Sequence, residues 1–118
     1  MNQEIKTLWV QALRSKTYTQ GQGDLRHNND FCCLGVLCNL AVEAEIVNQN
    51  PCEFEGNTRY YYGEHETTGY LPNEVMKWAG LLDDNPFIKL GERVREIATL
   101  NDEGTDFETL ANLIEAQF

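Results

Sequence analysis

Apolar positions dominate one stretch of the chain and recur at helical spacing on both sides of it. Between residues 31 and 44 nearly every position is apolar, and a helix that is apolar all round is normally buried. The stretch is shorter than the roughly 20 residues that cross a bilayer. We therefore predict that it forms a central core helix with Asp30 as its N-cap. One face of this helix would carry Cys33, Val36, Leu37, Leu40 and Ala44.

The same periodicity predicts three or four further helices. The first covers residues 2–14, and its apolar face should pack on the cysteine helix. That face consists of Ile5, Leu8, Trp9, Ala12 and Leu13. A second begins at Pro72 and stops at Gly80, because proline suits a first turn and glycine an end. A third is predicted around Val94–Leu100. The last begins at the capping box Thr105-Asp106-Phe107-Glu108.

Two segments between the helices have a different pattern. Thr58–Tyr62 has strand propensity, residues 63–66 resemble a turn, and Thr67–Leu71 would return as the partner strand. Residues 15–29 have no apolar period and are predicted to be a long loop, which in a compact domain is often functional. The expected fold is therefore α+β, a mainly helical single domain over residues 1–118 with four to five helices and one small antiparallel β-hairpin.

Charge excludes some classes of partner. The 118 residues carry a net charge of −10, and residues 1–30 are slightly basic while the remainder is strongly acidic. An acidic body disfavours direct binding to nucleic acid or to an anionic membrane. The start of the chain lacks a basic segment followed by an apolar run, and three of the four cysteines share one predicted helix. Both features favour a cytoplasmic location with free thiols.

The cysteines are the first candidates for chemistry. A helix N-terminus can lower a thiol pKa, so Cys32 or Cys33 with His65 or His27 would form a nucleophile and base. No third orienting residue is identifiable, and the alternative is that these cysteines are small core residues. A zinc site is disfavoured because no pair of Cys-x-x-Cys motifs is present. We expect no metal and no cofactor.

The segment 14–27 is the second candidate, because it collects basic residues in an acidic protein. Its glycines let backbone N–H groups approach a ligand, and its cations could pair with phosphates. Tyr18 could stack on a base, and the exposed tyrosines of the predicted hairpin would be a contact surface for a base or a partner, while at least half of the hairpin tyrosines are expected to pack in the core. The alternative is that Arg14 and Arg26 pair with local carboxylates. The predicted ligand-binding residues are Arg14, Lys16, Tyr18, Gln20, Gly21, Gly23, Arg26, Tyr60 and Tyr62.

Several segments together resemble a group of small proteins of bacteriophages and prophages. The most specific is Cys-Cys-Leu-Gly-Val-Leu-Cys at residues 32–38. The other matching segments are Trp9–Tyr18 with Gln20-Gly21 and Leu25-Arg26, Tyr70–Val75 with Trp78 and Gly80-Leu81, and Leu100–Gly104 with Phe107 and Leu113–Glu115. The resemblance implies a phage accessory protein, with counter-defence as the expected role in an infected bacterial cell. It assigns no catalytic residue.

Three hypotheses follow. The favoured one is a non-enzymatic binding protein that sequesters a phosphorylated small ligand, such as a nucleotide immune signal. The second is an acidic inhibitor that binds a host defence protein through its acidic surface, with DNA mimicry as one mode of inhibition. The third is a cysteine-dependent hydrolase. A homo-oligomer would suit sequestration, because ligand sites often lie between protomers.

Overall fold

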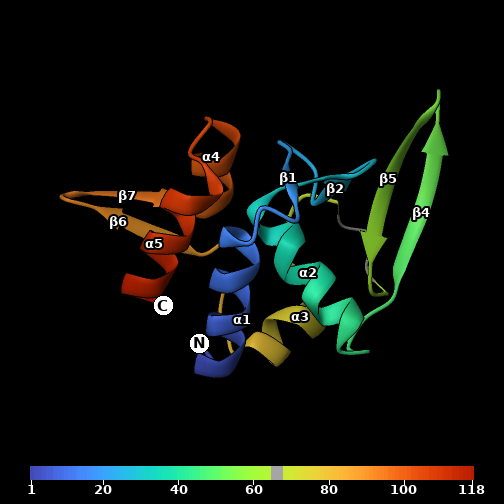
Figure 1. The fold of residues 1–118 in the computed structure, drawn as a ribbon. Helices are drawn as coiled ribbons and strands as arrows, with labels where there is room; N and C mark the ends of the chain where they lie inside the picture. Colours follow the sequence, from blue (N-terminus) through green and yellow to red (C-terminus); the bar gives the residue numbers. More distant parts are fainter. Residues whose placement is uncertain (65–67) are drawn as a thin grey trace.

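Helix α2 (Cys33–Glu43) lies in the middle of the molecule and contacts α1, α3, α4 and strand β3 (Figure 1). The structure is a computed structural model that describes residues 1–64 and 68–118. This part of the chain forms five helices, two sheets and one hydrophobic core. The other helices are α1 (Gln3–Arg14), α3 (Asn73–Ala79), α4 (Ile97–Asp102) and α5 (Phe107–Gln117). The strands are β1 (Thr19–Gln20), β2 (Arg26–His27), β3 (Asp30–Phe31), β4 (Gln49–Phe54), β5 (Asn57–Tyr62), β6 (Phe87–Leu90) and β7 (Arg93–Glu96).

Burial of α2 follows from its composition, because every residue from Cys33 to Cys38 is buried. The predicted N-cap is wrong. Cys32 caps the helix, and its Sγ accepts a hydrogen bond of 3.4 Å from Gly35 N. Asp30 does not cap the helix, because the Asp30 backbone is part of strand β3, which pairs with both β1 and β2.

Helix α1 confirms the prediction for residues 2–14, with Asn2 as its N-cap. Its Trp9 is fully buried and donates a hydrogen bond of 2.9 Å from Nε1 to the carbonyl oxygen of Cys33. The expected packing of the first helix on the cysteine helix is therefore confirmed. Helix α5 packs on another side of α1. The burial of one residue of α1 differs from the prediction. Leu8, which the pattern placed inside, is exposed, while Val10 is buried.

The larger sheet has five strands in the order β1-β3-β2-β5-β4. The predicted loop over residues 15–29 is wrong in part, because β1 and β2 lie within it. The strand predicted at 58–62 is confirmed as β5, but its partner is β4 and not residues 67–71. Residues 68–71 form no strand, and residue 67 lies outside the described residues. The sheet is therefore larger than the one hairpin expected.

A second hairpin, β6–β7, replaces part of a predicted helix. Val94 lies in β7, and α4 begins only at Ile97. The side-chain amide of Gln117 holds this hairpin against α5. Lys89 N donates to Gln117 Oε1 at 2.8 Å, and Gln117 Nε2 donates to Lys89 O at 2.9 Å. Gln117 thereby acts as a substitute for a third strand at the β6 edge.

Helix α5 begins one residue later than its capping box indicates. Asp106 is the N-cap, and its side chain accepts a hydrogen bond of 2.8 Å from Thr109 N. Hydrogen bonds from the side chain and from the backbone of Thr109 lower the pKa of the Asp106 carboxyl below its ordinary value. No helix within residues 1–64 and 68–118 is both long enough and apolar enough to cross a membrane.

Candidate functional site

The three cysteines at or near the start of α2 are buried free thiols. Burial raises the pKa of Cys32 to about 11 and raises those of Cys33 and Cys38 well above the ordinary value. A nucleophilic cysteine needs the opposite shift, because the thiolate is the reactive form. His65, the proposed base, lies outside the described residues. The described geometry therefore gives these thiols a structural role in the core.

Thiol labelling at neutral pH checks this assignment. Only Cys52 is exposed, so we expect one of the four thiols to react rapidly with Ellman's reagent in the folded protein. The other three should react only after unfolding. The variant Cys52→Ser serves as the control and should show no rapid reaction. Rapid labelling of that variant in the folded state would contradict a buried, protonated set of core thiols.

Both arginines of the basic segment are held by the protein itself. Arg14 pairs with Glu115 at 3.0 Å and Glu108 at 3.5 Å, and the hydrogen bond from Arg14 lowers the pKa of Glu115. Arg26 lies over the ring of Tyr60, with its guanidinium carbon 3.8 Å from the centroid. It also donates hydrogen bonds to Asn28 O, Asn29 Oδ1 and Gln49 Oε1. Neither guanidinium is open to a phosphate without first leaving these partners.

Gln20 and Gly21 are held to α4 and to the start of α2 through Asn101, and Gly23 is held to α4 through Asp102. The side chain of Asn101 is fully buried. Its Oδ1 accepts from Gln20 Nε2 at 2.9 Å and from Cys33 N at 3.1 Å, and its Nδ2 donates to Gly21 O at 2.9 Å. Gly23 N donates to Asp102 Oδ1 at 2.9 Å. Sequence reasoning overlooked Asn101, whose role depends on contacts about 80 residues away along the chain.

Four of the predicted ligand residues meet at one hollow. Arg14, Lys16, Tyr18 and Gln20 line a depression of about 290 Å³ that is also bordered by Asp106, Phe107 and Glu108. The remaining predicted residues are not among those that line it. The carboxylates of Asp106 and Glu108 would repel an anionic ligand that Arg14 and Lys16 attract, so the charges around this hollow largely oppose one another.

The predicted tyrosines are packed in different ways. Tyr62 is fully buried, and its hydroxyl has no hydrogen-bond partner in the described part of the chain. Burial raises the pKa of Tyr62. Tyr60 lies half-buried beneath Arg26, and Tyr18 OH accepts a hydrogen bond of 2.7 Å from Asn39 Nδ2. The packing role expected for at least half of the hairpin tyrosines therefore applies to Tyr60 and Tyr62.

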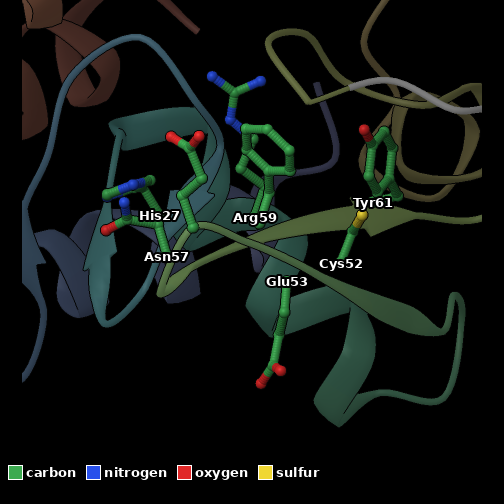
Figure 2. Close-up of a pocket in the computed structure, with 8 residues that line it drawn as sticks. His27, Cys52, Glu53, Asn57, Arg59 and Tyr61 are labelled. Carbon is green, nitrogen blue, oxygen red and sulfur yellow. The ribbon is translucent and has the colours of Figure 1, made fainter.

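A separate hollow of about 560 Å³ lies on the outer face of the β4–β5 hairpin (Figure 2). The strand register places His27, Arg59 and Cys52 in one row across β2, β5 and β4. Figure 2 shows Arg59 and Tyr61 extending to one side of the ribbon and Glu53 to the other. The residues lining the hollow are His27, Cys52, Glu53, Phe54, Glu55, Asn57, Arg59 and Tyr61.

Arg59 is the accessible cation of this face. Its side chain is 61% exposed and pairs with Asp24 at 3.4 Å. An exposed pair of this kind contributes only about 0–1 kcal/mol, so an incoming anion can replace the carboxylate at small cost. The alternation along β5 places Tyr61 on the same face as Arg59 and opposite to Tyr60 and Tyr62.

The whole chain, residues 1–118, matches one family model, described as Domain of unknown function (DUF8296). The chain belongs to the DUF8296 family. No curated protein and no solved structure matches it. The residues of the DUF8296 chain that could act chemically are therefore assigned from their geometry.

The hollow of this DUF8296 chain is equipped for binding. It offers a guanidinium, an imidazole and a carboxamide as hydrogen-bonding groups, and the rings of Phe54 and Tyr61 as apolar surfaces. The carboxylates of Glu53 and Glu55 also line it, so a phosphate would have to bind at the Arg59 end. Among the described residues, no group of three or more His, Cys, Asp and Glu side chains is placed to hold a metal ion. The volume lies within the range of about 300–1,000 Å³ that is typical of small-molecule sites.

Proposed function

We propose that this DUF8296 protein is a non-enzymatic binding protein that sequesters a phosphorylated small ligand, such as a nucleotide, in the outer hollow of the β4–β5 hairpin. The supporting observation is the coincidence of Arg59, His27 and Tyr61 on one face of three paired strands. Strands hold side chains in fixed register, so these groups need little ordering on binding.

Each group has a distinct task in this proposal. The guanidinium of Arg59 exchanges Asp24 for the phosphate, with which it can form two parallel hydrogen bonds. The ring of Tyr61 provides a surface on which a base stacks, an interaction worth about 1–3 kcal/mol per base. Asn57 provides an amide that can bond to base or sugar edges.

The basic segment contributes support for the sheet in place of ligand contacts. Arg26, half-buried on β2, is sandwiched near the rings of Phe31 and Tyr60, at 4.9 Å and 3.8 Å from their centroids. A cation–π pair of this kind contributes about 0.5–2 kcal/mol. Arg26 thus stabilises the pairing of β2, which carries His27, with β5, which carries Arg59 and Tyr61.

We further propose a phage origin and a counter-defence role in the infected bacterial cell. This part of the proposal is supported by the resemblance of the segments around residues 32–38 to small phage proteins, and it is independent of the site. Sequestration needs tight binding and no turnover, which agrees with thiols that are buried and protonated.

Calorimetric titration with mononucleotides and cyclic dinucleotides tests the proposed site. Arg59→Ala and Tyr61→Ala should each weaken binding at least tenfold, because each removes an interaction worth about 1.4 kcal/mol or more. Lys16→Ala is the matched control, since it removes an exposed cation from the other hollow, and it should leave the affinity unchanged.

Two outcomes of this titration would reject the proposal. One is no heat of binding with any of the nucleotides. The other is a loss of affinity in Lys16→Ala with none in Arg59→Ala, which would assign the ligand to the hollow beside α5. Inorganic phosphate and the free nucleoside, titrated separately, distinguish the contribution of the anion from that of the base.

A further inference from the structure

Two aromatic side chains, Phe54 and Tyr61, line the hollow of the β4–β5 hairpin at different places along its length. The strand register pairs Phe54 with Asn57 and Tyr61 with Asn50. Tyr61 follows Asn57 by four positions on β5, which is about 14 Å at the rise of an antiparallel strand. The backbone positions that carry the two rings are therefore well separated, and each ring is a stacking surface of its own.

Arg59 lies halfway between these two positions. It is two residues from Asn57 and two from Tyr61, and the alternation along β5 directs all three side chains to one face. Figure 2 shows Arg59 and Tyr61 on the same side of the ribbon. His27 lies opposite Arg59 on β2. An anion bound in this row would therefore have one aromatic ring on each side of it along the hairpin.

The charges at the hairpin tip determine where a ligand can carry its phosphates. Phe54 is 73% exposed and stands between Glu53 and Glu55, which also line the hollow. Their carboxylates repel a phosphate near Phe54, whereas the guanidinium of Arg59 attracts one. A ligand that reaches from Tyr61 to Phe54 must therefore carry its negative charge in the middle and none at the end beside Phe54.

We infer that the ligand of the proposed site is a linear dinucleotide, in which internal phosphates join two nucleosides. This inference rests on the proposed function and specifies its class of ligand. The phosphates bind Arg59 and His27 in the middle row. One base stacks on Tyr61 and the other on Phe54. Because every base has a π-face, such stacking tolerates different bases, so the geometry specifies two ring systems and not their identity.

Calorimetry with ADP and diadenosine diphosphate tests this inference, because the two ligands share one diphosphate and differ by one adenosine. The wild type should bind diadenosine diphosphate at least about fivefold more tightly than ADP, since a second base stacks. Phe54→Ala should remove this difference. It should weaken the binding of the dinucleotide at least about fivefold and change that of ADP by less than about twofold.

Two further variants serve as controls for the Phe54 ring. Phe54→Trp keeps an aromatic ring at the tip and should retain the preference for the dinucleotide. Phe87→Ala removes a phenylalanine that is 55% exposed on the other hairpin, so it should leave both affinities unchanged.

The outcomes separate this inference from the proposed function. Equal affinities of the wild type for ADP and the dinucleotide would overturn the inference, and so would an equal loss for both ligands in Phe54→Ala. In either case the binding of ADP would leave the proposed function standing, whereas binding of neither ligand would reject both. A single strand of four adenosine nucleotides should bind no more tightly than the dinucleotide, because its further phosphates meet the carboxylates at the tip. Tighter binding of that strand would assign the hollow to single-stranded nucleic acid and overturn the inference.

Discussion

Replacing Gly35 by alanine should destabilise this protein by about 3 kcal/mol or more, although the same change inside an exposed helix normally stabilises by up to about 1 kcal/mol. A Cβ built on Gly35 would lie 2.6 Å from the carbonyl carbon of Leu25 and closer still to its oxygen. That oxygen accepts a hydrogen bond of 3.2 Å from Cys32 N. The added methyl group would therefore push the Leu25 backbone away from the start of α2.

Urea denaturation of Gly35→Ala measures this effect directly. The matched control is Gly69→Ala, because a Cβ there meets nothing closer than Gly23 O at 3.8 Å, and it should change the free energy of unfolding by less than about 0.5 kcal/mol. Equal unfolding midpoints for Gly35→Ala and the wild type would show that α2 does not lie against the Leu25 backbone as described.

Replacing Asn101 by aspartate should cost about 3–5 kcal/mol at neutral pH, because it places a carboxylate in a fully buried site. Aspartate keeps the acceptor for Cys33 N but loses the Nδ2 donor, so Gly21 O and the Asp102 carboxylate lose their partner. Burial and Asp102 would both raise the pKa of the new carboxyl. A carboxyl with a raised pKa in the folded state binds a proton more readily there, so the lost stability should return in part as the pH falls.

Thermal or urea unfolding at pH 5 and pH 8 tests both the size and the sign of this effect. Asn73→Asp is the control, since Asn73 is exposed at the first position of α3 and an acidic residue there is favourable. A loss for Asn101→Asp that is the same at both pH values, or below about 1 kcal/mol, would contradict the buried network.

The helices with a clear apolar period could be predicted from the sequence. Residues 3–14 and 107–117 form α1 and α5 because each has a polar N-cap and an apolar face. Strand β4 could not be predicted in the same way, because it lies at the sheet edge with nearly all its residues exposed and contains Pro51. Its pattern of apolar and polar residues therefore has no period of two.

The β6–β7 hairpin could not be predicted from the sequence for another reason. Val94, Ile97 and Ala98 have helical spacing. In the structure Val94 lies in β7, and only Ile97 and Ala98 belong to α4. Because the spacing continues across the junction between strand and helix, periodicity alone assigns all three to one helix.

The candidate site was only partly accessible to sequence reasoning. Basic residues near glycines indicated a ligand loop, but the partners of Arg14 lie about 100 residues away in α5, and those of Arg26 include Gln49 in β4 and Tyr60 in β5. Arg59 was overlooked because its face became clear only once β4 and β2 were seen on either side of β5. The alternation of side chains along a strand at residues 59–62 was the sequence feature that could have indicated a face shared by Arg59 and Tyr61.

The central claim is that ligands bind on the outer face of the β2–β5–β4 strands. The most direct test is a ¹H–¹⁵N NMR titration of the wild-type protein with the nucleotide panel. The account predicts that the amide signals of His27, Arg59 and Tyr61 shift together and saturate. Shifts confined to Lys16 and Tyr18 beside α5, or no shift with any nucleotide, would contradict it.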